Sequence, residues 1–348
     1  NNKTIYAHIC QYKSKNLVVF YFVLYIFFMI RHKYTNIYIH NLCDVENCFT
    51  FETMCYIIKF QADISQHPYP KYIARIHRLC LSVLQVIYNY REKRTFVMKN
   101  MLNFKNFTAD ELMDILNLAL DMKKNPEKYA HALEGKKLYT LFEKTSTRTF
   151  LSFTTGITEL GGTYYNQLWK DSNFTLGEPV SEIKYVCRNV DIIMARLVKN
   201  ETVELFGDNV TVPFINGCDS SYHPCQILAD ALTIIEKFGS LDVKLMYIGA
   251  KNNVFNSLVE FFAKMKKGTI YGLTPLVNNT VCGDDFFEAA KATGHYVELD
   301  PTMSMEEAKK YAKDMDILYT DTWVDMEFFN NPAYKQQKEE TLAKMMPY

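Results

Sequence analysis

Four consecutive residues near the middle of the chain combine hydroxyl groups with a guanidinium group. Ser146, Thr147, Arg148 and Thr149 follow an apolar segment and open a segment with helical periodicity. The backbone N–H groups in the first turn of a helix attract anions, and a guanidinium group can bind phosphate through two parallel hydrogen bonds. A capped helix with surface hydroxyls would account for the serine and the threonines, but not for the arginine among them. The segment therefore predicts a phosphate-binding site.

Two further segments place polar side chains where a strand ends or a helix begins. Arg196 closes the apolar run Met194-Ala195-Arg196, where it is compatible with a surface position or with a cation that faces a ligand. His223 and Gln226 open a long helical segment and lie one turn apart, on the same side. A histidine can donate to a carbonyl oxygen that gains negative charge, and a glutamine can accept from an NH2 group. The alternative is a helix-cap histidine beside a solvated glutamine.

Asn252 and Asn253 lie in a turn between a predicted strand and a predicted helix. Paired amides of this kind can hold the carboxylate and amine of an amino acid, although Asn is also common in turns because it tolerates positive φ. The turn lacks the GxGxxG pattern, which excludes a Rossmann-type dinucleotide site there. Asp321 follows another short strand, where it can pair with an ammonium group or belong to a solvated acidic loop.

From residue 98 onward the chain alternates between strand-like and helix-like segments. Thr108 and Glu111, for example, form a capping box at the start of a helix. The alternation predicts an α/β protein with two domains, each a parallel sheet flanked by helices, divided near 235–240. Ligands bind such sheets at the carboxyl ends of the strands, where the polar segments fall. The predicted helices span 108–124, 147–160, 180–189, 223–237, 256–266, 283–293 and 305–313, and the strands span 137–142, 163–167, 191–197, 211–216, 244–248, 269–273, 295–299 and 317–319.

The composition is that of an ordinary globular protein. Among 348 residues, 39 Lys and Arg balance 39 Asp and Glu, so the chain lacks the basic excess typical of nucleic-acid-binding proteins. Nine cysteines without a CxxC pair indicate reduced thiols in a reducing compartment, and no zinc-ligand cluster is visible in the sequence.

Residues 1–97 form an uncharacterised extension that is crowded with Tyr, Ile, Phe, Asn and Cys. Within it, Leu17–Ile30 is an uninterrupted apolar run, shorter than the ~20 residues that a spanning helix needs. Three interpretations stay open: a signal-type region or short membrane anchor, a buried helix or strand, or sequence outside the natural product and the native fold. Met98 is a plausible start under the last interpretation.

In their order and spacing, these segments resemble the aspartate/ornithine carbamoyltransferase superfamily, and its ornithine branch in particular. The run 146–149 matches the S-T-R-T signature of the family, and 223–226 matches H-P-x-Q. Arg196 matches the second phosphate and carbonyl contact, while Asn252-Asn253 and Asp321-Thr322-Trp323 match a paired Asn and D-x-W more loosely. The resemblance covers roughly residues 100–348.

The resemblance implies a cytoplasmic homotrimer with active sites at subunit interfaces, a carbamoyl-phosphate-binding domain at 98–238 and an ornithine-binding domain at 239–348. It implies no metal or organic cofactor and no membrane or nucleic-acid partner. The implied reaction is reversible carbamoyl transfer from carbamoyl phosphate to ornithine, which gives citrulline and phosphate in arginine metabolism. The implied catalytic residues are Arg148, Arg196 and His223; these three bind carbamoyl phosphate with Ser146, Thr147, Thr149 and Gln226, and the acceptor lies against Asn253, Asp321, Asp325 and Met326.

Two features depart from the family pattern. Where the ornithine branch reads D-x-W-x-S-M-G, Asp325 and Glu327 replace Ser and Gly, and the added carboxylates favour a more cationic acceptor such as putrescine. The H-C-L-P motif of the family does not occur before Tyr348. We therefore expect a chain that is cut at both ends, truncated in its second domain and inactive or very weak as written. A transferase for another amine and a catalytically degenerate binding homologue remain the alternatives.

Overall fold

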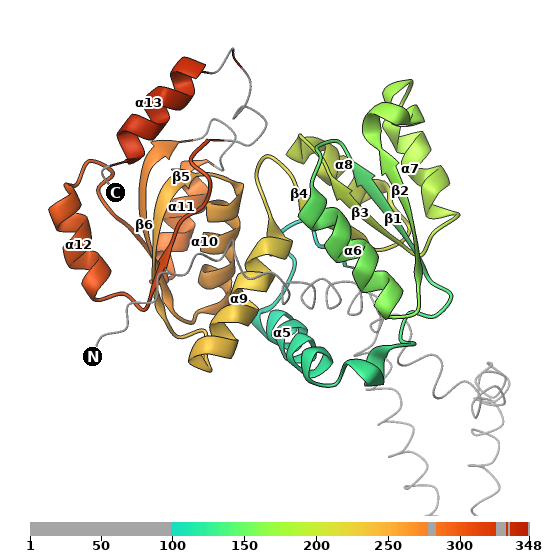
Figure 1. The fold of residues 1–348 in the computed structure, drawn as a ribbon, viewed down its shortest axis with the longest axis horizontal. Helices are drawn as coiled ribbons and strands as arrows, with labels where there is room; N and C mark the ends of the chain where they lie inside the picture. Colours follow the sequence, from blue (N-terminus) through green and yellow to red (C-terminus); the bar gives the residue numbers. More distant parts are fainter. Residues whose placement is uncertain (1–98, 278–282, 325–331, 333–334, 347–348) are drawn as a thin grey trace, which may run out of the picture. The chain divides into compact units, whose positions relative to one another are not determined.

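The computed structural model describes residues 99–277, 283–324, 332 and 335–346 (Figure 1). The expectations for residues 1–97, and those for Asp325, Met326 and Glu327, lie outside this part of the chain. Among its helices, none has the length and apolar character needed to cross a bilayer. Two four-stranded sheets organise the described residues, and every strand pairing in them is parallel. The predicted α/β class with a parallel sheet in each domain is confirmed.

The first sheet has the strand order β2-β1-β3-β4. This order places β1 and β3 at the centre and leaves β2 as an exposed edge. Helix α6 packs against β1 and β2, and α7 packs against α8. The strands are β1 (Lys137–Phe142), β2 (Thr163–Leu168), β3 (Ile192–Arg196) and β4 (Phe214–Cys218), and the helices are α6 (Thr147–Glu159), α7 (Pro179–Cys187) and α8 (Asn200–Asn209), with short 3-10 turns η5 (Trp169–Asp171) and η6 (Asn173–Thr175).

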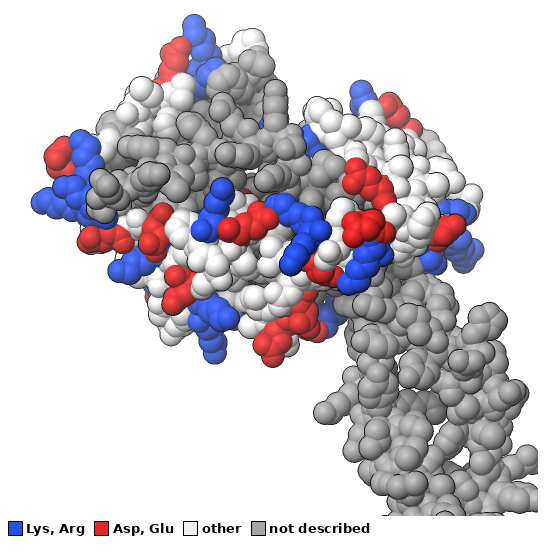
Figure 2. Space-filling model, turned by 60° about the horizontal axis from the view of Figure 1, so that its bottom comes forward, with Lys and Arg blue, Asp and Glu red and all other residues white. Residues whose placement is uncertain are grey.

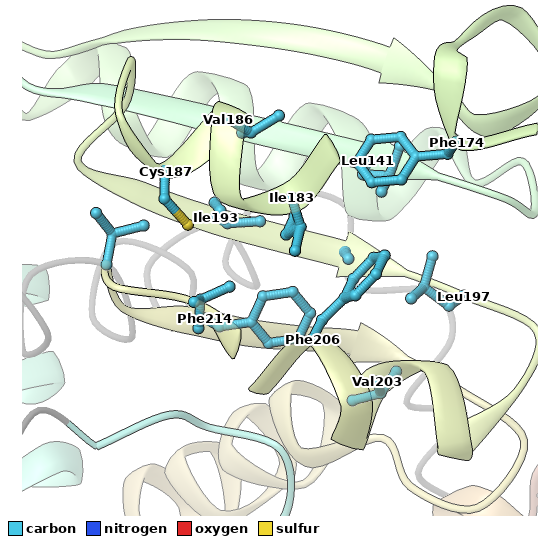
Figure 3. Packing of buried hydrophobic residues seen from close by; sticks show 13 residues of the cluster. Leu141, Phe174, Ile183, Val186, Cys187, Ile193, Leu197, Val203, Phe206 and Phe214 are labelled. Atoms are coloured by element: carbon cyan, nitrogen blue, oxygen red, sulfur yellow. The ribbon is translucent and has the colours of Figure 1, made fainter. Parts of the chain in front are cut away.

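A cluster of buried apolar side chains joins α7 and α8 to this sheet (Figure 3). Phe206 of α8 and Phe214 of β4 meet edge to face, with ring centroids 6.3 Å apart. Ile183 of α7 and Ile193 of β3 are fully buried in the same cluster. Burial of such side chains contributes about 1.5–3 kcal/mol each. The cluster thus holds the central strands whose ends carry the polar segments.

The second sheet has the order β7-β6-β5-β8. Side chains of β5 alternate between its two faces: Met246 packs in a cluster with Leu273 and Ala308, whereas the Tyr247 ring lies 4.7 Å from the ring of Phe255. Helices therefore cover both faces. The strands are β5 (Lys244–Lys251), β6 (Thr269–Val277), β7 (Tyr296–Glu298) and β8 (Ile317–Tyr319), and the helices are α10 (Asn253–Met265), α11 (Asp284–Ala292), α12 (Met305–Lys313) and α13 (Lys335–Met345).

Two helices connect the sheets: α5 (Ala109–Lys124), followed by the short turn η4 (Pro126–Tyr129), and α9 (Pro224–Phe238). The predicted capping box of Thr108 and Glu111 is present at the start of α5. Helix α9 packs against β4, α5 and α10, and Lys123 of α5 forms an ion pair with Glu236 of α9. On the face shown in Figure 2, acidic and basic side chains lie interspersed, as expected from the zero net charge.

Several predicted boundaries were wrong, and two helices were missed. Helix α10 begins at Asn253, not at 256, because the Asn252 side chain caps it by accepting from Phe255 N. Strand β4 spans Phe214–Cys218, not 211–216, since its pairing to β3 begins only after Pro213. Helix α8 was missed because few of its residues are buried, and α13 buries only Met345 among its described side chains. A helix with so few apolar positions shows little periodicity.

Gly268, between α10 and β6, should tolerate no side chain. Its φ is +67°, and an added Cβ would lie 2.4 Å from Leu241 O and 2.7 Å from Val243 O. We expect Gly268→Ala to lower the free energy of unfolding by about 3 kcal/mol or more, since left-handed strain and a clash with backbone add together. Gly239→Ala is the matched control, with φ +74° and open space around the added Cβ, and should cost only about 1 kcal/mol. Urea denaturation of both variants measures the difference, and equal losses would contradict this account.

Candidate active site

The carboxyl ends of β1, β3 and β4 lie side by side. Phe142 pairs with Arg196, and Arg196 pairs with Cys218 across a register shift. Because the strands are parallel, the loops that follow them start from the same edge of the sheet. One of these loops is held in place by Glu143, whose backbone N donates to Arg196 O (2.9 Å) and whose Oε2 accepts from Val198 N (2.7 Å). The predicted phosphate segment, Arg196 and the segment leading to His223 thus arise at one edge.

Ser146 caps α6, as its sequence position predicts. Its Oγ accepts from Thr149 N (3.3 Å) and donates to Thr149 Oγ1 (2.9 Å), which buries Thr149. Thr147 and Arg148 are exposed in the first turn of the helix. This first turn offers backbone N–H groups, hydroxyls and one guanidinium group to an anion.

Arg196 is half-buried at the end of the central strand β3. Its Nη1 donates to Gly217 O over 3.4 Å, which is a long bond. Its Nε is buried and makes no hydrogen bond to any residue that the structure describes. A buried N–H donor without a partner is costly, so a ligand acceptor at this position would be favoured.

His223 lies at the start of α9, where Pro224 occupies the first helical position. Its backbone N donates to Ser257 Oγ of α10 (2.8 Å), whereas its ring Nδ1 is buried and has no hydrogen-bond partner within the described chain. Burial, followed by the positive charges of Arg196 and Arg148, lowers the pKa of His223 to about 3. The two guanidinium groups therefore act on one neutral imidazole.

Gln226 lies one turn further along α9, and its side chain has a hydrogen-bond partner within the protein. Its Nε2 donates to Asp230 Oδ1 (3.0 Å), and Asp230 Oδ2 accepts from Tyr319 OH (2.8 Å). Burial raises the pKa of Asp230 to about 7, against the lowering effect of these two hydrogen bonds. Sequence reasoning included Gln226 but assigned no role to Asp230 or Tyr319.

The paired asparagines Asn252 and Asn253 bind different partners. Asn252 is buried as the cap of α10 and donates through Nδ2 to Asp321 Oδ2 (3.0 Å). Asn253 donates through Nδ2 to Asp219 O (2.6 Å) and reaches Cys218 Sγ (3.3 Å), at the end of β4. Burial raises the pKa of Asp321, while Thr322 N–H, the Asn252 amide and the charge of Arg148 oppose the rise. Arg148 is therefore the common neighbour of His223 and Asp321.

Two residues at the end of β4 and in the loop after it, Cys218 and Asp219, escaped sequence reasoning. Asp219 is buried, and its carboxylate accepts from Ser221 N (2.7 Å), Tyr222 N (2.6 Å) and the side chains of Asn200 (2.8 Å) and Asn216 (2.9 Å). These bonds shape the turn that delivers His223. The run Asp219-Ser220-Ser221 is a turn signal that could have indicated this role. Cys218 has φ +143°, a strained value for a residue with a side chain.

Comparisons with known proteins identify the family of this chain. Residues 99–236 match the family model described as "Aspartate/ornithine carbamoyltransferase, carbamoyl-P binding domain", and residues 241–348 match the "Asp/Orn binding domain" of the same family. The chain belongs to the aspartate/ornithine carbamoyltransferase family. It is accordingly a transferase, and the predicted family membership is confirmed.

The relatives of this carbamoyltransferase include enzymes with different acceptors in their names. An ornithine carbamoyltransferase of Listeria innocua is 37% identical over 233 residues, covering 66% of this chain and 72% of the relative. The ornithine carbamoyltransferase of Pyrococcus furiosus has a similar structure (TM-score 0.62, 32% identity, 72% of this chain and 78% of that one). The catalytic subunit of M. Jannaschii aspartate transcarbamoylase is also similar (TM-score 0.57, 28% identity, 70% and 80%). Carbamoyl transfer is common to these names, whereas the acceptor differs among them.

The protonation state of His223 can be tested directly. With its pKa lowered to about 3, the ring should stay neutral, so its C2–H resonance should not move between about pH 5 and pH 8, where an ordinary histidine titrates. Proton NMR across this range measures the shift, and His223→Asn assigns the signal by removing it. A midpoint near 6.5 for this signal would show that the ring is neither buried from water nor close to the two guanidinium groups.

Proposed function

We propose that this carbamoyltransferase transfers the carbamoyl group of carbamoyl phosphate to the side-chain amine of ornithine, giving citrulline and phosphate. The observation that carries the proposal is the meeting of two buried, unpartnered nitrogen atoms, Arg196 Nε and His223 Nδ1, with the start of α6 at one edge of a parallel sheet, within the described part of the chain. Guanidinium and imidazole nitrogen atoms beside a helix start suit a phosphate joined to a carbonyl group. The ornithine enzymes among the relatives support the choice of acceptor.

In this proposal carbamoyl phosphate binds first. Its phosphate lies at the start of α6, against the hydroxyls of Ser146 and Thr147 and the guanidinium group of Arg148, with Arg196 on the other side. The unpartnered Nε of Arg196 and the ring of His223, with Thr149, then face the carbonyl oxygen. With the charge of Arg148 taken up by the phosphate, Asp321 would depend on the Thr322 N–H, the Asn252 amide and the ammonium group of the acceptor to stay ionised.

The chemical step is an attack by the neutral amine on the carbamoyl carbon. A C–N bond forms, the bond from that carbon to the bridging phosphate oxygen breaks, and phosphate leaves with the electron pair and takes up the proton that the attacking nitrogen loses. The negative charge that grows on the carbonyl oxygen is stabilised by Arg196, His223 and Thr149. The reaction needs no covalent intermediate on the protein, so positioning and electrostatics account for the rate.

The acceptor side rests on Asn253 and Asp321, with Asp325 and Met326 as sequence-based candidates. Asp325 and Glu327 stand where the ornithine branch has uncharged residues, which keeps putrescine as an alternative acceptor. A homotrimer in the cytoplasm, acting in arginine metabolism, also remains a proposal. Exposed Tyr164 and Tyr165 on the edge strand β2 support an interface between copies, because large exposed apolar groups on a sheet edge favour association.

Removal of the Arg148 guanidinium group tests the phosphate site. We expect Arg148→Leu to weaken the binding of carbamoyl phosphate at least about 100-fold, because two charge-assisted hydrogen bonds are lost. Isothermal titration calorimetry measures the dissociation constant. Arg188→Leu is the matched control, since Arg188 is an exposed arginine at the end of α7 and should leave the affinity unchanged. Equal affinity of Arg148→Leu and the wild type would remove the basis of the proposed function.

Removal of the charge of Asp321 tests the acceptor site. Asp321→Asn still accepts from Asn252 but loses the pairing with an ammonium group, so the KM for ornithine should rise about tenfold or more while the affinity for carbamoyl phosphate stays within about twofold. Asp314→Asn, at an exposed position after α12, is the control. Initial rates with ornithine, putrescine and aspartate complete the test, and faster turnover of putrescine would reassign the acceptor to a diamine.

A further inference from the structure

Asp230 is a buried carboxylate that accepts hydrogen bonds from its own helix α9 and from strand β8 of the second sheet. It lies on α9 with 1% of its surface exposed. Its Oδ1 accepts from Gln226 Nε2 (3.0 Å), on the same helix, and its Oδ2 accepts from Tyr319 OH (2.8 Å), at the end of β8. The reaction described above makes no use of Asp230. A buried carboxylate is costly unless its position serves an interaction that an apolar residue cannot provide.

The chemistry of the Gln226 side chain gives Asp230 a role. A glutamine amide has a donor end and an acceptor end that differ little in shape, so its orientation is set by its partners. In its ionised form, which the hydrogen bonds from Gln226 and Tyr319 favour, Asp230 only accepts and therefore binds the NH2 end of Gln226. The end left for a ligand is the oxygen Oε1. An oxygen acceptor matches the NH2 of a carbamoyl group, and it has nothing to bind in a methyl group at the same place.

Tyr319 holds the carboxylate in the orientation that this role requires. Its ring stacks on Tyr247, with centroids 5.6 Å apart and planes 27° apart, and Tyr247 OH donates to Ala250 O (2.8 Å). The hydroxyl of Tyr319 is thus fixed by packing. Burial favours the protonated form of Asp230, whereas donation from Tyr319 and Gln226 favours the ionised form. The charge of Asp321 is the other ionisable influence on Asp230 and favours protonation.

We propose that Asp230 is a positioning residue that turns the oxygen of Gln226 toward the carbamoyl group, and that Tyr319 fixes Asp230 for this purpose. The enzyme would then distinguish carbamoyl phosphate from acyl phosphates that lack the NH2 group through a side chain of the second sheet. This inference rests on the proposed function, because it assumes that carbamoyl phosphate binds beside Gln226.

The test compares carbamoyl phosphate with acetyl phosphate, which carries a methyl group in place of the NH2. Calorimetry on the full chain gives the affinity ratio of the two ligands. We expect Asp230→Leu to reduce this preference roughly tenfold, mainly through weaker binding of carbamoyl phosphate, because the Gln226 amide is no longer oriented. Gln226→Leu should reduce it equally, and Asp230→Leu in that background should have no further effect.

Tyr319→Phe keeps the stacked ring and provides a second variant should Asp230→Leu fail to fold. Without the hydroxyl, burial favours the protonated carboxyl, whose O–H would bind Oε1 of Gln226 and turn the amide around. The preference for carbamoyl phosphate should therefore fall several-fold. Glu260→Leu is the matched control, since Glu260 is a buried carboxylate that accepts from Phe104 N (2.9 Å) elsewhere in the chain, and the ratio should stay unchanged.

The outcomes separate this inference from the proposed function. Suppose that the wild type prefers carbamoyl phosphate and that Asp230→Leu and Tyr319→Phe both keep this preference. The positioning role is then overturned and the proposed function stands. Where Asp230→Leu does not fold, Tyr319→Phe alone decides. If Asp230→Leu lowers the ratio equally in the presence and absence of Gln226, the role assigned to Gln226 is overturned. If the wild type binds neither ligand, the proposed function itself fails.

Discussion

The constraint on which the site depends is the positive charge near a neutral, half-buried imidazole whose Nδ1 is buried. Arg148 and Arg196 both act on His223, although they come from a helix start and a strand end. Like charges repel each other, and the Nε of Arg196 is buried, so the arrangement requires a rigid support. The parallel register of β1, β3 and β4 supplies it, and the neutral state of His223 avoids a third positive charge. A dianionic phosphate would relieve the repulsion, which gives the site a chemical preference for such an anion.

Elements around the second sheet, α10 and β8, also determine the geometry of this site. Ser257 accepts from the backbone N of His223, Asn253 donates to Asp219 O, and Tyr319 donates to Asp230. Two of these residues belong to α10, whose cap Asn252 also holds Asp321. Helix α10 therefore contributes to the geometry of the carbamoyl side and of the acceptor side at once. A substitution of Asn252, Asn253 or Ser257 should be judged by its effect on both substrates, because these residues orient groups for each.

The sequence predicted much of the fold because the relevant signals are local. The capping box at Thr108, the apolar run that ends at Arg196 and the Pro224 start of α9 depend only on neighbouring residues. Helix α8 gave no such signal, since its buried residues Val203 and Phe206 are too few to show a period. The same limit applies to the turn after β4, where the role of Asp219 depends on Asn200, which is close in space but belongs to another helix.

The site residues show the same division between local and distant information. Ser146 could be recognised as a helix cap from its own segment, and its bond to Thr149 follows from that position. The partner of Gln226 lies only four residues away, yet the pairing acquires a meaning only when Tyr319 closes it from a strand far along the chain. Sequence spacing identifies which side chains share a helix face, but it does not show which end of an amide is already occupied. That information comes from the packing of β8 against β5, because this pairing brings the Tyr319 ring onto Tyr247 and the hydroxyl onto Asp230.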